Sequence, residues 1–429
     1  MPAKRFDNLT DWLLWQSRLH PSVIALGLDR VDRVWARLGP KHLPFLVISI
    51  AGTNGKGSCA AMLEAVYAAA GYRTACYTSP HLLRYNERIH LDGRDVTDDA
   101  LCDAFERVDA ARGDVALTYF EFGTLAAMDL FIRAAPDVTI LEVGLGGRLD
   151  AVNLFDADLA LITSIGRDHT AWLGETLEEI ACEKAGIMRA GRPVVIGHRD
   201  PLSALLESAE RLGSHINILG RDFDFDSSGT DWRWMGPGFP PLPLASPAMH
   251  GKVQYDNAAA VLMCLSCLGD RLPVSLANLR QGLQRARIPG RFQVLPGEPT
   301  WILDVAHNGP AAAVLAENLS TVRCLGKRHA VLGMLSDKEP GTVVGHLLEW
   351  VDLWHLGAAE DPRAMPTGDL GAALRAVDVG VDLRTYGAIR EAIAGARKAA
   401  EVGDCILVFG SFSTVEAAMR QIPEPLPTK

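Results

Sequence analysis

The chain has 429 residues, of which 48% are hydrophobic and 22% charged, with a formal net charge of −10. This length exceeds one typical core and predicts two or three domains, at roughly 150 residues per domain. The acidic balance argues against nucleic acid or an anionic membrane as partner. The only close cysteine pair, Cys264 and Cys267, lies in an apolar helical run, which is more typical of core packing than of a metal site. We expect a cytoplasmic protein without a membrane span.

The first predicted strand, Phe45 to Ile50, is continuously apolar and runs into a predicted helix from Ser58 to Gly71. Between them lies the glycine-rich turn Gly52-Thr-Asn-Gly-Lys-Gly-Ser58. There, backbone N–H groups and the positive helix end can converge on a polyphosphate, and Lys56 adds a full charge. This pattern predicts a nucleoside triphosphate as ligand. The alternative is an ordinary glycine-rich turn between strand and helix.

The turn departs from the common phosphate-loop pattern. That pattern has glycine five residues before the Gly-Lys pair, where this chain has Ile50, and Ser or Thr directly after the lysine, where it has Gly57. The loop is therefore a variant form.

Further strands alternate with helical stretches and predict a doubly wound parallel sheet with helices on both faces. These strands are expected at Thr74 to Thr78, Val138 to Leu141, Leu159 to Ile165 and Pro193 to Gly197. Residues 216–247 are rich in turns and prolines and predict a small antiparallel insert.

A second alternating series follows Arg287-Ile-Pro-Gly-Arg291, which we interpret as a hinge. Its strands are expected at Trp301 to Val305, His329 to Leu335, Val351 to Leu356, Val381 to Tyr386 and Cys405 to Phe409. We therefore predict an α/β protein with a phosphate-loop domain at 1–288 and a smaller Rossmann-like domain at 289–429.

Three side chains near the ends of the first-domain strands are candidates for chemistry. Glu142 ends a buried strand and is a metal candidate, the alternative being a solvated carboxylate. His169 follows the next strand and would suit only a second, less demanding metal position, since Mg²⁺ prefers oxygen; the alternative is a hydrogen-bonded loop histidine. Lys184 lies in the last turn of the predicted helix Thr176 to Ala185, where the helix dipole alone would favour a lysine.

Several segments match a known family in order and spacing between Leu19 and Val415. They are Gly52-Thr-Asn-Gly-Lys-Gly-Ser58, Ser79-Pro-His-Leu-Leu-Arg-Tyr-Asn-Glu-Arg-Ile89, Thr118-Tyr-Phe-Glu121, Glu142-Val-Gly-Leu-Gly-Gly-Arg-Leu-Asp-Ala-Val-Asn153, Asp168-His169, Glu183-Lys-Ala-Gly-Ile187 and Asp304-Val-Ala-His-Asn308. The chain resembles the folylpolyglutamate synthases of the Mur ligase superfamily, and more closely the bacterial bifunctional dihydrofolate synthase/folylpolyglutamate synthases.

The resemblance implies cofactors and the residues that hold them. ATP phosphates would be bound by Thr53, Asn54, Gly55, Lys56, Gly57 and Ser58, and other parts of the nucleotide by Asn257, Arg291 and Asp304. One Mg²⁺ would be held by Ser58, Ser79 and Glu142, and a second metal by His169. Lys184 matches a lysine that is carbamylated in this superfamily, which would require a neutral amine. Lys56, Lys184 and His307 would be the catalytic groups.

The resemblance also implies a pterin pocket and a glutamate site. The pocket would contain Ile24, Ala25, Leu26, Arg84, Thr118, Phe120, Glu121, Leu149, Asp150 and Ala151. In it, Phe120 could stack on the heterocycle, or be simple core, and Asp150 could accept hydrogen bonds from its N–H groups. L-glutamate would bind near His307 and Ser411.

The implied reaction converts a carboxylate to an acyl phosphate with ATP, after which the amine of L-glutamate attacks. The expected substrates are dihydropteroate, reduced folates, L-glutamate and ATP, bound by a monomer. Alternatives are a folylpolyglutamate synthase alone, another Mur-type amino-acid ligase, or a nucleotide-switched regulatory or scaffold protein that uses the phosphate loop only as a sensor.

Overall fold

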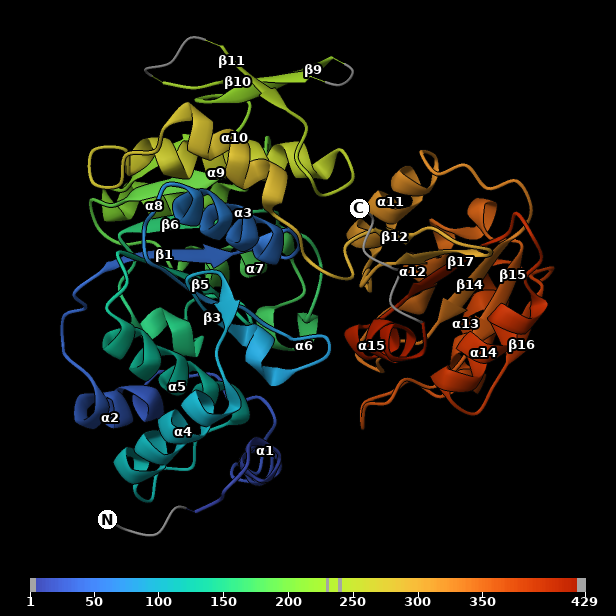
Figure 1. The fold of residues 1–429 in the computed structure, drawn as a ribbon, viewed down its shortest axis with the longest axis horizontal. Coiled ribbons are helices and arrows are strands. Elements are labelled where there is room, and N and C mark those ends of the chain that lie inside the picture. The colour runs from blue at the N-terminus through green and yellow to red at the C-terminus, as the bar shows by residue number, and fades with distance from the viewer. Residues whose placement is uncertain (1–4, 229–230, 238–240, 423–429) are drawn as a thin grey trace. The chain divides into compact units, whose positions relative to one another are not determined.

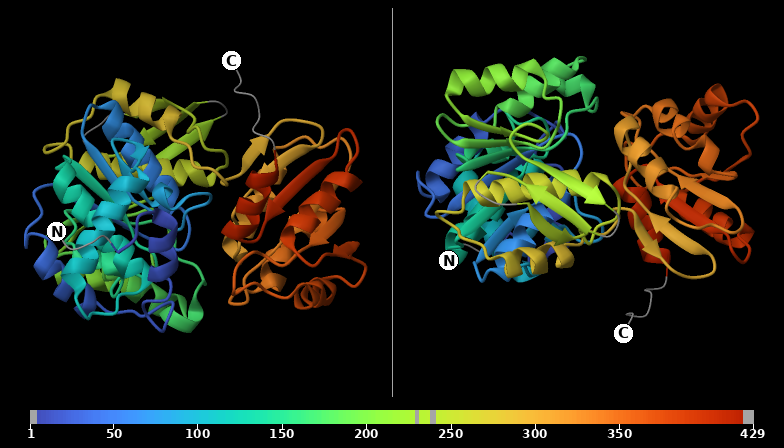
Figure 2. Two further views of the ribbon diagram at one scale, coloured as in Figure 1. Left: turned by 60° about the horizontal axis from the view of Figure 1, so that its bottom comes forward. Right: turned by 90° about the horizontal axis from the view of Figure 1, so that it is seen from above.

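The computed structural model describes residues 5–228, 231–237 and 241–422 (Figure 1). The chain forms two compact units. The first contains the residues up to Ile165, Leu173–Ala248 and Tyr255–Arg287, and the second contains Gly166–Trp172, Met249–Gln254 and the residues from Ile288 onward. Figure 2 shows both from two further directions. The second unit is therefore assembled from three separate stretches of sequence.

The first unit is built on an eight-stranded sheet, counted over the described residues, in the order β4-β3-β2-β5-β1-β6-β7-β8. The strands are β1 Leu46–Ala51, β2 Thr74–Tyr77, β3 Ile89–Leu91, β4 Arg94–Asp95, β5 Val138–Glu142, β6 Leu159–Ile162, β7 Pro193–Ile196 and β8 His215–Ile218. All pair in parallel except β3 and β4, which form an antiparallel edge beside β2. β1, β5 and β6 are buried along their whole length, because helices cover both faces, which explains their continuous apolar sequences.

Helices flank this sheet on both sides, with α3, α9 and α10 on one side and α2, α4 and α5 on the other (Figure 1). The helices of the first unit are α1 Leu9–Gln16, α2 Asp29–Leu38, α3 Lys56–Ala69, α4 Asp98–Arg112, α5 Tyr119–Ala134, α7 Leu177–Ala185, α8 Ser203–Leu212 and α10 Leu276–Arg285, with the short turns η1 Tyr85–Arg88 and η2 Ala151–Leu154. Two more, α6 Thr170–Leu173 and α9 Val253–Cys267, begin in the second unit and end in the first.

A small antiparallel sheet follows, with strands β9 Asp224–Ser228, β10 Asp231–Met235 and β11 Leu242–Ala245. It packs on α9, since the indole N–H of Trp234 donates to Ala259 O at 3.2 Å and Phe225 stacks on Tyr255. The expectation that this insert begins at residue 216 was wrong. Residues His215–Ile218 form β8, which pairs in parallel with β7 and so belongs to the main sheet.

The second unit has a six-stranded sheet within the described residues, in the order β12-β13-β17-β14-β15-β16. Its strands are β12 Gln293–Leu295, β13 Thr300–Leu303, β14 Arg328–Leu332, β15 Leu353–Leu356, β16 Leu383–Thr385 and β17 Cys405–Phe409. Its helices are α11 Gly309–Leu319, α12 Pro340–Gly345, α13 Thr367–Val377, α14 Ile389–Ala399 and α15 Phe412–Gln421, with the turn η3 Leu348–Trp350. Among the described strands of this sheet, only β12 is antiparallel to its neighbour.

The predicted fold class is confirmed: a doubly wound α/β unit carrying a phosphate loop and a small antiparallel insert is followed by a smaller α/β unit. Several predicted strands end earlier than expected, for example β14 at Leu332 rather than Leu335. In the part of the chain that the structure describes, no helix is long and apolar enough to cross a bilayer.

Candidate functional site

The loop between β1 and α3 is hydrogen-bonded to the residues that directly follow β6. Thr53 N donates to Ser164 O at 2.7 Å, and the hydroxyl of Thr163 donates to Asn54 O at 2.7 Å. Lys56 Nζ folds back onto the loop and donates to Gly52 O at 3.0 Å. No side chain caps the start of α3, so the N–H groups of its first turn face the loop, an arrangement suited to an anion.

Two glycines of this loop could not be replaced without distortion. Gly52 has φ +150°, and a Cβ there would lie 1.8 Å from the hydroxyl oxygen of Thr163. Gly55 has φ +90°, and its Cβ would lie 2.7 Å from Oδ1 of Asn257. These close approaches explain the glycines that the sequence pattern singled out. They also show that Asn257, on α9, lies against the phosphate loop.

Glu142 ends β5 at the same sheet edge and is buried. Its Oε2 accepts a hydrogen bond from Ser79 N at 3.1 Å, while Ser58 is buried in the first turn of α3. Carboxylate and hydroxyl oxygens are the donors that Mg²⁺ prefers. Among the described residues, no three His, Cys, Asp or Glu side chains group as metal ligands. A metal here would thus depend on one carboxylate, on hydroxyls and on ligand phosphates, which is ordinary for Mg²⁺.

Lys184 is buried, with only 3% of its surface exposed, near the end of α7. That end packs directly on the glycine-rich loop after β5: Arg148 N donates to Glu183 O at 2.8 Å, and a Cβ on Gly147 would lie 2.6 Å from the same oxygen. Burial disfavours the charged form of a lysine. Carbamylation of Lys184 stays a prediction.

The predicted pterin residues Phe120 and Asp150 meet at Gly144, where a Cβ would lie 2.7 Å from the ring of Phe120 and 3.3 Å from Oδ2 of Asp150. Asp150 caps η2, accepting from Val152 N at 3.0 Å and from Leu145 N at 2.9 Å. Burial raises the pKa of Asp150 to about 7, against the lowering effect of these backbone donors and of Lys56.

Sequence reasoning missed Arg30, which joins the other segments of the predicted pocket. Its Nε donates to Oε1 of Glu121 at 3.0 Å, and its NH2 group donates to Ala25 O at 2.5 Å. The loop that contains Ala25 is also hydrogen-bonded to Leu149, whose carbonyl oxygen accepts from Gly27 N at 3.1 Å. A buried glutamate needs a partner charge, so the position of Glu121 was the signal that could have found Arg30.

The other residues predicted for the pocket either stabilise the local fold or are partly exposed. Thr118 and Glu121 form a capping box at the start of α5. Ile24 and Leu26 are half-buried and Ala151 is buried in η2. Arg84 is exposed and pairs with Asp98 at 3.1 Å.

In the second unit, a polar cluster surrounds the carboxylate of Asp168. Lys338 Nζ lies 2.5 Å from Oδ1, and Asn308 Nδ2 donates to Oδ2 at 2.9 Å. His307 Nε2 lies 3.4 Å from Oδ2. Burial alone would raise the pKa of Asp168, but the hydrogen bond from His307 and the nearby positive charges hold it well below its usual range. Lys338 was missed because it is distant in sequence; its only signal was its place after the carboxyl end of β14.

His169 adopts φ +52°, and burial lowers its pKa to about 4, against the opposing effect of Asp168. A neutral ring leaves a nitrogen lone pair for a ligand. His307 Nδ1 donates to Val305 O at 2.7 Å, which fixes its other nitrogen toward Asp168.

The last predicted residues, Arg291, Asp304 and Ser411, lie in the same unit. The Arg291 guanidinium lies over the ring of Phe412 at 5.1 Å. Asp304 accepts from Phe292 N at 2.8 Å and from Ala306 N at 2.7 Å, and burial raises its pKa. Ser411 is buried and caps α15.

Comparisons with known proteins show which family the chain belongs to. Residues 50–224 match the family model "Mur ligase middle domain", and residues 290–412 match "Mur ligase, glutamate ligase domain". The chain is 40% identical over 419 residues to the dihydrofolate synthase/folylpolyglutamate synthase of Escherichia coli K12, covering 96% of this chain and 95% of that protein. The chain belongs to this family. The relative of the same name from Haemophilus influenzae is 38% identical, covering 97% and 98% of the two chains.

Two solved structures of the family each match 98% of this chain. The structure described as E. coli FolC in complex with DHPP and ADP has a TM-score of 0.91 at 38% identity and covers 98% of this chain and 99% of that one. A bifunctional folylpolyglutamate synthase/dihydrofolate synthase described with Mn, AMPPNP and L-glutamate bound has a TM-score of 0.88 at 40% identity, with the same coverage. The individual residue roles in this chain stay predictions.

Proposed function

We propose that this protein is an ATP-dependent ligase that joins L-glutamate to dihydropteroate, giving dihydrofolate, and to reduced folates, lengthening their glutamate chain. The observation that carries the proposal is the uncapped start of α3 behind a glycine-rich loop, in a chain that matches a member of this family over 96% of its length. In this reading the backbone N–H groups from Thr53 to Ser58 hold the phosphates of ATP. Lys56 exchanges its carbonyl partners for phosphate oxygens.

Other nucleotide contacts are assigned to Asn257 for the base and to Arg291 and Asp304. Mg²⁺ would be held by Glu142, Ser79 and Ser58, whose oxygens suit it, and a second metal by the neutral ring of His169. When bound, the metal supplies positive charge against the phosphate oxygens during transfer. The residues of the loop supply the rest of that stabilisation through fixed N–H dipoles.

The chemistry begins with the substrate carboxylate, whose oxygen attacks the terminal phosphate of ATP and releases ADP. The acyl phosphate then meets the amine of L-glutamate near His307 and Ser411. Attack forms a tetrahedral intermediate, which expels phosphate and loses a proton to leave the amide. In the pterin pocket, Phe120 stacks on the heterocycle and Asp150 accepts its N–H groups.

Lys184 acts in this proposal as a carbamate, formed when its neutral amine attacks CO₂. This requires a neutral amine, and the Lys184 side chain is buried, an environment in which lysines in general lose charge more readily. Lys184→Ala should be nearly inactive, and short carboxylates should restore part of the activity. Intact-protein mass that shows a bare amine in fully active enzyme would exclude the carbamate.

The deciding experiment measures ADP release with dihydropteroate, tetrahydrofolate and a UDP-muramyl substrate in parallel, each with and without L-glutamate. Turnover with both pterins that requires glutamate is expected. Turnover with tetrahydrofolate alone would reduce the activity to folylpolyglutamate synthesis, and ATP hydrolysis independent of all three would favour a sensor. Gel filtration and cell fractionation test the further proposals of a monomer in the cytoplasm.

A further inference from the structure

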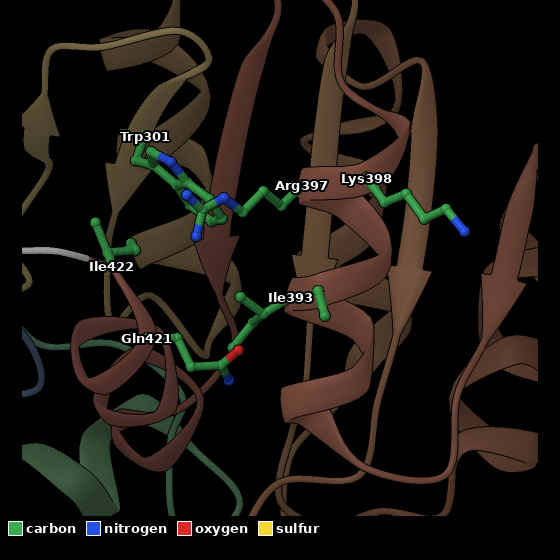
Figure 3. A pocket seen from close by; sticks show the side chains of 7 residues that line it. Trp301, Ile393, Arg397, Lys398, Gln421 and Ile422 are labelled. Atoms are coloured by element: carbon green, nitrogen blue, oxygen red, sulfur yellow. The ribbon is translucent and has the colours of Figure 1, made fainter.

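A hollow of about 300 Å³ in the second unit is closed along the wall that a ligand would contact. Figure 3 shows Trp301, Ile393 and Gln421 among the residues that line it. Trp301 is 7% exposed, Ile393 is 2% exposed, and Nε2 of Gln421 is buried. Neither the aromatic face nor this amide is open to a second molecule. A histidine of the first unit, in contrast, presents an open donor.

His81 lies in the loop that follows β2, at the sheet edge where β5 ends in Glu142 and β1 leads into the phosphate loop. The backbone N–H two residues before it donates to Oε2 of Glu142 at 3.1 Å. The His81 ring contacts Tyr85 edge-on, with centroids 5.7 Å apart, and Tyr85 contacts Tyr119, the residue before Phe120. The contacts of this loop thus lead to the metal candidate on one side and to the predicted pterin pocket on the other.

A hydrogen bond from Arg88 determines which nitrogen of His81 carries a proton. Arg88 Nε donates to His81 Nδ1 at 2.8 Å, and a guanidinium has no acceptor, so Nδ1 must be the acceptor. The ring is then neutral, with its proton on Nε2. Among the described residues Nε2 forms no hydrogen bond, and it is not a buried atom, because His81 is only half-buried. It is therefore an N–H donor that a ligand can reach.

Arg88 is itself fixed in place by aromatic rings. It is 9% exposed, and its guanidinium lies over the rings of Tyr85 and Tyr119, at 5.3 and 5.7 Å. No carboxylate of the described residues forms an ion pair with it, although a buried cation is normally paired with one. The positive charge of Arg88 therefore favours an anionic group beside His81.

We propose that Nε2 of His81 donates a hydrogen bond to the carboxylate of the acceptor substrate, with Arg88 as the positioning residue that fixes the tautomer. This role rests on the proposed ligase function. One carboxylate oxygen attacks the terminal phosphate of ATP, while the hydrogen bond orients the carboxylate through its other oxygen. When the amine attacks the acyl phosphate, that second oxygen becomes the oxyanion of the tetrahedral intermediate, and the same donor stabilises it.

Two variants separate the donor of His81 from its bulk. His81→Phe keeps a ring without the N–H and should lower kcat with dihydropteroate by about 10²-fold, the loss typical of one oxyanion donor. His81→Gln places an amide N–H near the position of Nε2 and should stay within about tenfold of the wild type. Affinity for an unreactive ATP analogue should not change in either variant. His42→Phe, at an exposed position, is the control.

The kinetic outcomes distinguish the role of His81 from the ligase function. Full activity in His81→Phe, or equal losses in His81→Phe and His81→Gln, would overturn the role of His81 while the wild type still ligates glutamate. If the wild type turns over no acceptor at all, the ligase function is refuted, and the role of His81 with it.

Ring ¹⁵N NMR tests the tautomer without turnover. The His81 signal, identified by its loss in His81→Gln, should show a proton on Nε2 that shifts saturably when dihydropteroate is added with the ATP analogue. Arg88→Met should release the ring to a mixture of both tautomers and lower kcat tenfold or more. A proton on Nδ1 in the wild type, or no shift at saturating dihydropteroate, would overturn the proposal even if His81→Phe does not fold.

Discussion

The carboxylate of Asp150 has two tasks in the first unit. It caps η2 through backbone hydrogen bonds, and it lies beside Phe120 at the predicted pterin pocket. Burial raises its pKa to about 7, so its charge changes within the range in which enzymes are assayed. If Asp150 accepts hydrogen bonds from the pterin, only its ionised form can do so at full strength.

We therefore predict that kcat/KM for dihydropteroate rises about tenfold between pH 6 and pH 8, as Asp150 loses its proton. Asp150→Asn should flatten this rise and lower kcat/KM at pH 8 by about 10²-fold, with a smaller loss for tetrahydrofolate. Steady-state kinetics with both substrates provide the measurement. Asp156→Asn is the control, because that side chain is 85% exposed. An unchanged pH profile in Asp150→Asn would exclude the assigned role.

At the scale of elements, Arg30 connects α2 to the start of α5 and to the loop that precedes α2. Its charge lies 2.8 Å from Glu121, whose side chain is 4% exposed, so removal of the cation leaves a buried carboxylate without its partner. The segments predicted to bind the pterin are thereby held by a residue that need not touch it. Arg30 is a positioning residue.

Arg30→Met should lower the free energy of unfolding by about 1–3 kcal/mol and raise KM for dihydropteroate more than it lowers kcat. Denaturant unfolding and steady-state kinetics measure the two effects. Arg33→Met, an exposed position on the same helix, should change neither. A loss of stability without a change in KM would mean that Arg30 supports only the fold.

A second feature at this scale is a series of polar side-chain contacts that crosses the sheet of the second unit. His329 Nε2 lies 3.1 Å from Asp404, His329 Nδ1 lies 3.2 Å from His355 Nε2, and His355 Nδ1 lies 3.1 Å from the hydroxyl of Tyr386. Burial, His329 and Arg384 lower the pKa of His355 to about 4. Because the unfolded chain then binds more protons between about pH 6.5 and pH 4, stability should fall as the pH drops through this window.

His355→Gln should reduce the slope of the unfolding free energy against pH by the equivalent of up to one bound proton. Glutamine can still hydrogen-bond but does not titrate. Urea unfolding at pH 7.5, 6 and 5 measures the slope. The exposed His346→Gln serves as control. Equal slopes in all three proteins would show that His355 does not titrate differently on folding.

The features that could be predicted from the sequence are those set by residues close together in the chain. Continuous apolar runs identified the buried strands, and the glycines at 52 and 55 are explained by backbone angles and close approaches. It did not predict Arg30 or Lys338, because each is paired with a residue far along the chain. It also misplaced β8, since a short half-buried strand at a sheet edge has the same composition as an insert strand.

At the scale of the whole molecule, the second unit depends on residues far from its main stretch. Asp168 accepts a hydrogen bond from the ammonium group of Lys338, whose side chain is only 6% exposed. A fragment that starts at Ile288 would lack Asp168 and leave Lys338 with the longer contact to Asp337, at 3.6 Å, in place of its 2.5 Å partner.

We predict that a fragment of residues 288–429 is poorly folded and that Lys338→Met within it restores part of the lost stability, by about 1–3 kcal/mol. In the full chain the same substitution should instead destabilise, since Asp168 then loses its cation. Thermal unfolding of the four proteins gives the sign in each context. If Lys338→Met destabilises both the full chain and the fragment, then Lys338 stabilises the second unit even when Asp168 is absent.

The division of the chain also limits how such proteins can be recombined. Since Gly166–Trp172 and Met249–Gln254 belong to the second unit, the backbone passes from one unit to the other several times. A chimera with a relative that joins two parents at one crossover near residue 288 would combine a main stretch from one parent with two short segments from the other. Exchanging all three stretches together keeps Asp168 with the Lys338 of the same parent. Chimeras made in this way should therefore fold better than those with a single crossover.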